Sequence, residues 1–281
     1  NIILCYPSHS VHPTSDMISG FEEVFGANVP IIGGYSTDNL KLKNSFQFVD
    51  DTTYEWGALA IGLADPTLEV IAESAHGFNP MEASLEVTRS EGSRVFELDG
   101  KPAWHAFTEL LGLAKTADRL RVVAMAELAE ELPREFHEAY GSKYLIVGGA
   151  LREDDDSITF NTTCPVGKKL RLLERDEQGI FDSVDAIGKR ITTRLAGRKP
   201  VAVFHADCAA RGKASFNRIL KEEVIDRLQG PICSVPDLPG IKKNIPWLGM
   251  YGDGELAPLL GHNMAHTFTS SVQVIVERED A

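Results

Sequence analysis

The feature that most constrains this sequence is an internal repeat. Residues 29–39, VPIIGGYSTDN, and residues 245–255, IPWLGMYGDGE, carry proline, glycine and tyrosine at identical spacing. The matched pairs are Pro30 and Pro246, Gly33 and Gly249, and Tyr35 and Tyr251. Each stretch follows an apolar run and a segment of helical periodicity, and such recurrence indicates a duplicated supersecondary unit. We interpret the chain as two copies of one unit.

The flanking segments extend the repeat. Three further pairs match in type and order: 2–8 with 201–207, 15–25 with 215–228, and 56–63 with 269–276. The first and last pairs are strand-like and the middle pair is helical. The sequence therefore predicts a mixed α/β (α+β) fold with two similar halves, each a β-sheet with packed helices, related by a pseudo-twofold axis.

The chain between the copies gives a coarser prediction. Residues 46–99 are mostly strand-like, residues 102–112 predict a helix, and residues 124–140 contain good helix formers interrupted by Pro133. No long stretch rich in Pro, Gly or Ser marks a linker. We assign a first domain to 1–150 and a second to 151–281, with the boundary somewhere between 112 and 200.

Charge and cysteine usage exclude several classes of protein. With 41 acidic and 28 basic residues the formal net charge is −13, which disfavours nucleic acid and anionic membranes as partners. No apolar run approaches the roughly 20 residues of a transmembrane helix, so membrane insertion is not expected. The four cysteines are widely spaced without a C-x-x-C pair, which favours a cytoplasmic location. Because the chain starts at Asn1 without an initiator methionine, we expect it to be trimmed at its amino end.

The segment FHADCAARG at 204–212 is the sharpest local signal. It places Cys208 at the end of an apolar run, close to His205 and Arg211. A nearby guanidinium lowers the pKa of a thiol, so Cys208 could be a nucleophile with His205 or His266 as base. The alternative is that Cys208 packs inertly in the core. Arg211 requires a carboxylate partner, from either the protein or a ligand.

A second signal is Glu255, which follows Gly252 and Gly254 in GDGE. Glycines permit close backbone approach, so the Glu255 carboxylate could accept hydrogen bonds from a ligand amine or from Arg211. The alternative is that Glu255 is the exposed acid of a tight turn.

His262 and His266 are four residues apart and could share a helical face, but no HExxH pattern makes them metal ligands. Phosphate-loop, dinucleotide and GxSxG motifs are absent from the sequence. We therefore expect neither a metal nor a cofactor.

Read in order, several segments resemble the FIST family, whose amino- and carboxy-terminal parts occur together in bacterial signalling proteins and in some eukaryotic F-box proteins. The resemblance covers nearly the whole chain. It is carried by PIIGGYSTDN, by residues 77–112 and 144–173, by VFHADCAARG, and by GMYGDGELAP with the later His266 and Thr269. The most specific parts are EVTRSEGSRVFELDGKPA and the pairing of CAARG with GDGELAP.

The resemblance implies a sensory module for small ligands, for which amino acids have been proposed. Such modules are often fused to receptors, kinases or cyclic-nucleotide enzymes. This chain departs from the pattern in a longer insert at 233–246 and in carrying no output domain. A signalling output protein or fused domain is therefore an expected partner.

The resulting hypothesis is a cytoplasmic, non-enzymatic sensor that binds an amino acid or related carboxylate between its two halves. Arg211 would clamp the ligand carboxylate inside a shared hollow, Glu255 would meet a cationic or hydroxyl group, and backbone N–H groups at 33–36 and 252–254 would complete the site. The expected ligand-binding residues are Gly33, Gly34, Tyr35, Ser36, Cys208, Arg211, Gly212, Tyr251, Gly252, Gly254, Glu255 and His266. Two alternatives remain open, a cysteine-dependent enzyme and a protein-docking scaffold.

Overall fold

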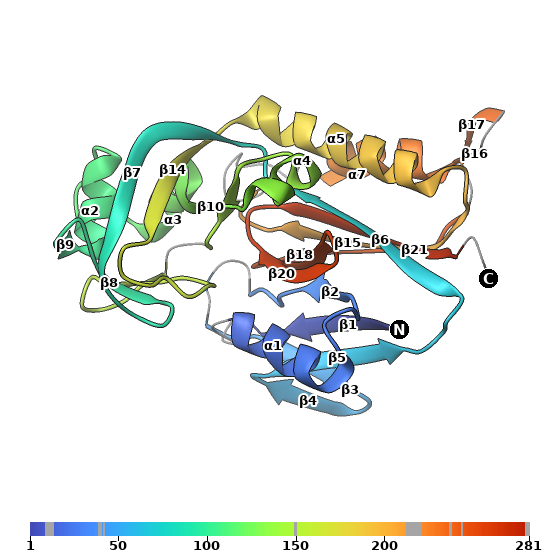
Figure 1. The fold of residues 1–281 in the computed structure, drawn as a ribbon, viewed down its shortest axis with the longest axis horizontal. Helices are drawn as coiled ribbons and strands as arrows, with labels where there is room; N and C mark the ends of the chain where they lie inside the picture. Colours follow the sequence, from blue (N-terminus) through green and yellow to red (C-terminus); the bar gives the residue numbers. More distant parts are fainter. Residues whose placement is uncertain are drawn as a thin grey trace.

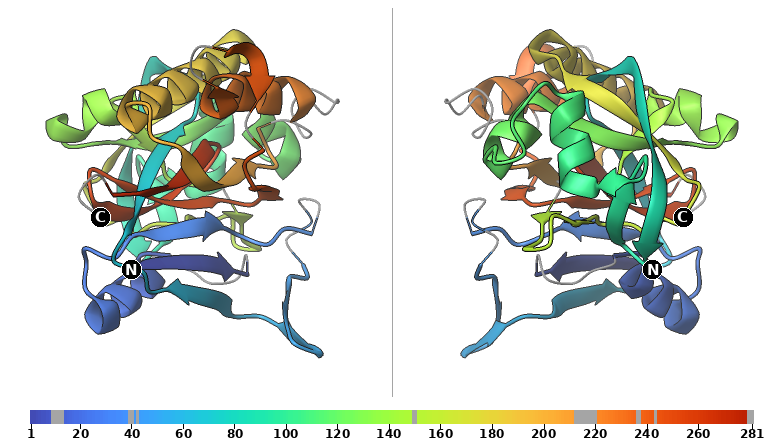
Figure 2. Two further views of the ribbon diagram at one scale, coloured as in Figure 1. Left: turned by 90° about the vertical axis from the view of Figure 1, so that its right-hand side faces the viewer. Right: turned by 90° about the vertical axis from the view of Figure 1, so that its left-hand side faces the viewer.

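A computed structural model describes residues 1–8, 14–38, 41, 43–148, 151–211, 221–235, 238–242 and 244–278. The central part is a stack of four layers: a pair of helices, a sheet, a second sheet and a single helix, as Figures 1 and 2 show. A long sheet with its own helices extends to one side of this stack (Figure 1). The predicted mixed α/β architecture is confirmed.

The first sheet contains the first copy of the repeat. It comprises β1 (Ile2–Pro7), β2 (Ile31–Gly34), β5 (Ala58–Leu63), β19 (Glu255–Leu259) and β20 (His262–His266), in the order β20-β19-β2-β1-β5. Strand β1 runs parallel to β2 and antiparallel to β5. Ile3 and Cys5 pack with α1 (Thr14–Phe25), whereas Ile2 and Leu4 face the second sheet. Burial of both faces explains the uninterrupted apolar sequence of β1.

The second sheet repeats this pairing. It comprises β6 (Leu68–Ala75), β15 (Pro200–Cys208), β18 (Trp247–Gly252) and β21 (Ser270–Glu277), in the order β18-β15-β21-β6. Strand β15 is parallel to β18 and antiparallel to β21, as β1 is to β2 and β5. Helices α5 (Glu177–Leu195) and α7 (Lys221–Cys233) cover its outer face. The apolar residues of α5 recur at helical spacing, which is why it buries one side.

Hydrogen bonds align the two copies residue by residue. The amide of Ile3 donates to the Pro30 carbonyl over 2.9 Å, and the amide of Val203 donates to the Pro246 carbonyl over 2.9 Å. Cys5 therefore corresponds to His205, one residue later than the sequence comparison of 2–8 with 201–207 implies. That comparison was wrong by one position, and in a strand this exchanges the two faces.

The long sheet has the order β11-β10-β14-β7-β8-β13-β12, with β9 paired to β8. Its strands are β7 (Phe78–Glu91), β8 (Arg94–Leu98), β9 (Lys101–Pro102), β10 (Ala126–Glu131), β11 (Tyr144–Ile146), β12 (Leu151–Arg152), β13 (Ile158–Thr159) and β14 (Lys169–Arg175). The helical segments beside it are α2 (Ala103–Leu110), α3 (Arg119–Met125), η1 (Arg134–Phe136) and α4 (His137–Tyr140). Trp104 and Phe107 of α2 are fully buried in its core. Two hairpins complete the described chain: β3 (Phe46–Val49) with β4 (Thr52–Glu55), and β16 (Ser234–Val235) with β17 (Leu238–Lys242).

The good helix formers noted within 124–140 do not form one helix. Residues 126–131, AELAEE, form the strand β10, which lies between β11 and β14. Ala126 to Ala129 are all buried there, so pairing on both edges and burial on both faces override the helical propensity of Ala, Glu and Leu. Only short helices precede and follow this strand.

Strands from both halves of the sequence share sheets. Strand β6 lies in the sheet of the second copy, and β19 and β20 lie in the sheet of the first. The division at residue 150 and the pseudo-twofold axis stay predictions.

Among the described residues, no helix combines the length and apolar character needed to cross a membrane.

The repeated glycines give a direct test of this fold. Gly33 has φ +141°, and a Cβ there would lie 2.0 Å from the Cys5 carbonyl oxygen, whereas a Cβ at Gly249 would meet nothing closer than 3.7 Å. We expect Gly33→Ala to lower the free energy of unfolding by about 3 kcal/mol or more, because backbone strain and overlap add. The matched Gly249→Ala should change it by less than about 1 kcal/mol. Urea unfolding of both variants measures this, and equal effects would contradict the assigned register.

Candidate functional site

The two glycine-rich bends of the repeat lie in direct contact. The Tyr35 amide donates to the Gly254 carbonyl over 2.9 Å, and the Thr37 hydroxyl donates to the Asp253 carboxylate over 2.8 Å. A Cβ on Gly252 would lie 2.6 Å from the Tyr35 carbonyl oxygen, so this position requires glycine. The junction therefore joins the two sheets through backbone.

This contact corrects one expectation about the bends. The amide of Tyr35 already donates to Gly254, and the amide of Ser36 donates to the Pro7 carbonyl over 2.9 Å. The Ser36 hydroxyl accepts from Gln47. These groups are engaged within the protein and are not available to a ligand as the sequence hypothesis required.

Next to the junction lies a set of buried polar side chains from seven different elements and loops. We call it the polar centre; its members are His76, Tyr140, Asp207, Cys208, Arg211, Glu255, His266 and Thr269. Cys208, Arg211, Glu255 and His266 were predicted from the sequence as site residues, and the structure brings them together. Tyr140 ends α4 and His76 follows β6, and neither carries a local motif that could have indicated it.

Arg211 is only 1% exposed, so the expectation of a guanidinium exposed in an open hollow was wrong. Its Nε lies 3.1 Å from Oδ1 of Asp207, and its Nη1 donates to the Ala75 carbonyl over 3.2 Å. A buried charge needs such a partner, because desolvation otherwise costs several kcal/mol. Its Nη2 has no hydrogen-bond partner within the structure.

Glu255 begins β19 and is fully buried, which excludes the exposed tight-turn acid. Its Oε2 accepts from the Thr269 hydroxyl at 2.5 Å and from the Thr269 amide at 3.3 Å, while Oε1 has no partner. Burial raises the pKa of Glu255 well above its usual range, and nearby Asp207 adds to this rise. Its protonated form is therefore favoured over the range expected for an exposed glutamate.

His266 stacks on Tyr140 with 5.6 Å between ring centroids, and His76 packs edge-on to Tyr140 at 5.7 Å. Nε2 of His266 lies 3.1 Å from the Ala257 carbonyl oxygen, which only accepts, so this nitrogen carries the proton. Its Nδ1 is then a lone-pair acceptor without a partner, as the Tyr140 hydroxyl is also unpartnered. Burial lowers the pKa of both His76 and His266 to about 4.

His262 and His266, whose spacing would also suit one face of a helix, lie on the strand β20. His262 is exposed at one end and His266 is buried at the other. In the described part of the chain, no three His, Cys, Asp or Glu side chains are placed to hold a metal ion.

The thiol of Cys208 has the opposite character from the one expected. Burial raises its pKa well above the usual range, and the nearby Glu255 adds to this, although the sequence had suggested a lowered value. The Cys208 amide donates to the Thr269 carbonyl over 3.0 Å, which fixes the end of β15 beside the start of β21. His205 bonds to Ser270 and its pKa is lowered by burial.

Two cavities can be described near these layers. The larger, about 1060 Å³, lies between the start of β1, β6, α5 and the β19–β20 turn, and its lining includes Lys189, Arg190 and Arg194. The smaller, about 270 Å³, lies between α1, β11 and β20. The sequence-predicted site residues do not appear in the described lining of either cavity.

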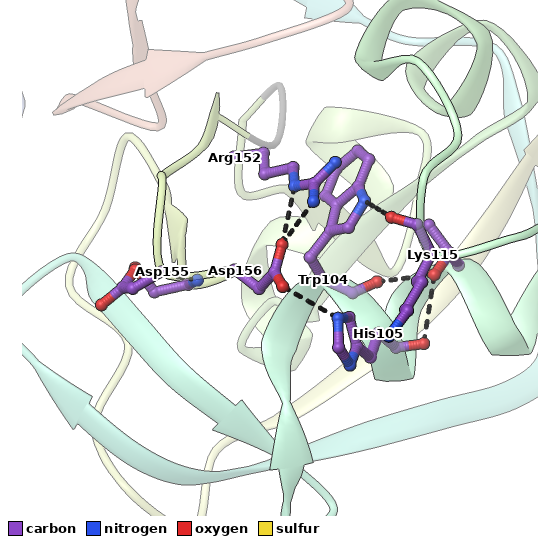
Figure 3. Close-up of polar contacts among 8 residues, drawn as sticks. Trp104, His105, Lys115, Arg152, Asp155 and Asp156 are labelled. Carbon is purple, nitrogen blue, oxygen red and sulfur yellow. Dashed lines mark hydrogen bonds and ion pairs between the residues drawn. The ribbon is translucent and has the colours of Figure 1, made fainter.

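A separate polar cluster lies on the long sheet (Figure 3). Asp156 pairs with His105 at 2.9 Å and accepts from Arg152, whose guanidinium lies 5.4 Å from the Trp104 ring centroid. The Trp104 indole donates to the Lys115 carbonyl, so these contacts fasten the turn before β13 to α2. We assign the cluster a structural role.

Two further residues were predicted as part of the site. Gly212 falls outside the described residues. Tyr251 is 40% exposed on β18, and partial burial together with Asp207 raises its pKa to about 12.

Comparison with known proteins decides the family. Residues 2–101 match the FIST N domain and residues 117–258 match the FIST C domain. The chain belongs to the FIST family. An uncharacterized protein of Mycobacterium bovis is 24% identical over 277 residues, covering 97% of this chain and 65% of the relative. An uncharacterized protein of Mycobacterium tuberculosis is 24% identical over 249 residues, covering 88% of this chain and 61% of the relative.

The FIST chain thus spans less than two thirds of the length of these mycobacterial relatives. A shorter match, 32% identical over 83 residues, links it to an uncharacterized protein of the archaeon Methanocaldococcus jannaschii and covers 30% of this chain and 16% of the relative.

The cysteine chemistry can be tested by alkylation. Cys5, Cys164, Cys208 and Cys233 are all buried thiols. We expect native protein at pH 6 to react slowly with iodoacetamide at every position, with labelling accelerated by denaturant, because the thiolate is disfavoured and access is blocked. An engineered Ala114→Cys, at an exposed position, reports the rate of an accessible thiol. Fast labelling of Cys208 alone, located by mass spectrometry, would favour the enzyme alternative.

The pKa of Glu255 predicts how stability depends on pH. The unfolded chain ionises this group near its ordinary value of 4.5, whereas the folded protein keeps it protonated, so its contribution to stability falls as pH rises above that value. We expect the free energy of unfolding of Glu255→Gln not to fall in this way. The difference in free energy of unfolding between this variant and the native protein should therefore grow by at most about 1.4 kcal/mol per pH unit. Urea unfolding from pH 5 to 8 measures this. The exposed control Glu135→Gln should follow the native curve, and parallel curves for Glu255→Gln would disprove the assignment.

Proposed function

We propose that this FIST chain is a sensory domain that binds a small polar ligand, an amino acid or a related carboxylate, in the polar centre. One observation carries the proposal: Tyr140, Arg211, Glu255 and His266 each bury a polar atom that has no hydrogen-bond partner. Leaving such an atom unpaired costs about 1 to 3 kcal/mol, so four in one region call for a molecule that pairs with them.

The unpaired atoms divide into donors and acceptors. Nη2 of Arg211 and the hydroxyl of Tyr140 can donate, whereas Nδ1 of His266 can only accept in its neutral form. A ligand carboxylate would accept from Arg211 and Tyr140, and a ligand ammonium would donate to His266 and Oε1 of Glu255. This pattern complements the two charged groups of an amino acid.

Electrostatics support the same arrangement. Arg211 and Glu255 are close enough to influence the pKa of Tyr140, and Arg211 also acts on Glu255. An ammonium group next to Glu255 would favour its ionised form, so ligand binding would release a proton from this carboxyl group. Ligand and protonation would then be linked through one residue.

A sensor also needs an output step, which we place in a separate domain or partner protein. The mycobacterial relatives are longer than the region that this chain matches, which is consistent with additional segments in such proteins. We also place the two halves of the repeat about a pseudo-twofold axis that passes near the junction of the bends. A ligand beside that junction would contact both halves and could change their relative position.

Tyr140→Phe tests the proposal more sharply than truncation of Arg211. Arg211→Ala would remove a buried, paired charge and is expected to destabilise the protein by about 3 to 5 kcal/mol. Tyr140→Phe removes only an unpartnered hydroxyl, so the free energy of unfolding should stay equal or rise slightly. We expect affinity for the bound amino acid to fall at least about tenfold, as measured by calorimetry with each of the twenty amino acids.

The control is Tyr54→Phe, which changes an exposed tyrosine on β4 and should leave affinity unchanged. Absence of heat with every amino acid at millimolar concentration would refute the ligand class. Unaltered affinity in Tyr140→Phe, with native stability, would place the ligand elsewhere.

A further inference from the structure

The outer edge of the first sheet is a strand without the features that normally protect an edge. Strand β5, with the sequence ALAIGL, ends the sheet order, and within the described residues only β1 pairs with it in a ladder. It contains no charged residue and no proline, which are the usual means of preventing association at an edge. Ala58, Ala60, Ile61 and Gly62 are exposed. An edge of this kind is a template for a further strand.

In the second copy of the repeat, the corresponding edge is paired with a further strand. Strand β21 holds the position in its sheet that β5 holds in the first, because Val272 lies opposite His205 as Ala60 lies opposite Cys5. The other edge of β21 is covered by β6, which pairs with it in antiparallel orientation from Ser270 to Glu277. At the corresponding position beside β5, no strand of the described chain forms a ladder.

The hairpin that precedes β5 exposes two aromatic rings on one face. Phe46 is 41% exposed and Phe48 68%, and they lie on the same face because they are two residues apart in β3. No third strand of the described chain pairs with β3 or β4. Figure 2 shows the hairpin reaching away from the body of the molecule, and its base is anchored by Gln47, which donates to the Tyr6 carbonyl. A two-stranded hairpin is marginally stable in water unless one face is covered.

We propose that this surface, formed by β5 and the β3–β4 hairpin, is the interface of a homodimer in which two β5 strands pair in antiparallel orientation across a twofold axis. Antiparallel pairing of a strand with its own copy satisfies the same edge on both chains, so the interface is self-complementary and closed. The two five-stranded sheets become one continuous sheet. The hairpin of each chain then lies along the partner.

The available area suits this arrangement. An aromatic side chain offers roughly 150 to 250 Å², so Phe46 and Phe48 together leave roughly 200 Å² of apolar surface per chain on one face of the hairpin. This area and the exposed residues of β5 contribute to the roughly 800 Å² per partner that a stable interface buries. The strand itself brings no like charges together, which matters for a chain whose net charge is −13.

Sedimentation equilibrium of the 281-residue chain at 1 to 100 µM tests the proposal. We expect a dimer that Ile61→Lys weakens at least about tenfold, because the substitution places a charge on the edge strand as natural edges do. Leu248→Lys is the matched control, since Leu248 is 59% exposed on the edge strand β18 of the other sheet. It should leave the dimer intact.

Disulfide crosslinking of engineered cysteines provides a second test, which does not depend on disrupting the dimer. Because the native thiols are buried, Ala60→Cys and Ile61→Cys place one accessible thiol near the proposed axis. At least one of them should form an intermolecular disulfide on mild oxidation, whereas Val166→Cys, at a residue that is 63% exposed, should not. A monomer at 100 µM overturns the proposal. A dimer that Leu248→Lys disrupts and Ile61→Lys leaves unchanged overturns it as well.

Discussion

The contact between the two glycine-rich bends is the constraint on which the rest of the structure depends. At Gly252 a side chain would overlap the backbone of Tyr35, and at Gly33 it would overlap the backbone of Cys5. Because these glycines have no side chain, the chain can pass from the second bend into β19, which pairs with β2. The first sheet is therefore completed by the second half of the chain. The same step puts Glu255 into the interior at the point where the sheets meet.

That geometry also explains the unusual chemistry of the polar centre. The ends of β15 and β20 and the start of β19 meet there, and each delivers a polar side chain into a region closed to water. Burial favours the protonated form of Glu255 and lowers the pKa of His76 and His266 to about 4, and the ion pair of Arg211 with Asp207 lies among these groups. A region of this kind responds strongly to an added charge, because little solvent screens it. This is a favourable physical basis for detecting a small charged ligand.

Several parts of the fold could be predicted because they depend on local pattern. The apolar strands β1 and β15, helix α1 and the glycine bends follow from periodicity and turn chemistry. The repeat indicated a matched order of elements, whereas the parallel pairing of β1 with β2 and of β15 with β18 came from the structure. Strand β10 could not be predicted, since AELAEE has helical propensity and becomes a strand only between β11 and β14. For the site, the segments around Cys208 and Glu255 were evident, whereas Tyr140 lies in a four-residue helix without any motif.

The sequence by itself determined the repeated Pro-x-x-Gly-x-Tyr pattern and where its glycines lie. It also placed Arg211 and Glu255 near the ends of strands, because these are properties of neighbouring residues. Only the tertiary structure decided that Arg211 is enclosed and paired, that Cys208 stays protonated, and that His76 and Tyr140 join them. Burial and electrostatic environment arise from residues far apart in the chain, and no local pattern records which of them will meet.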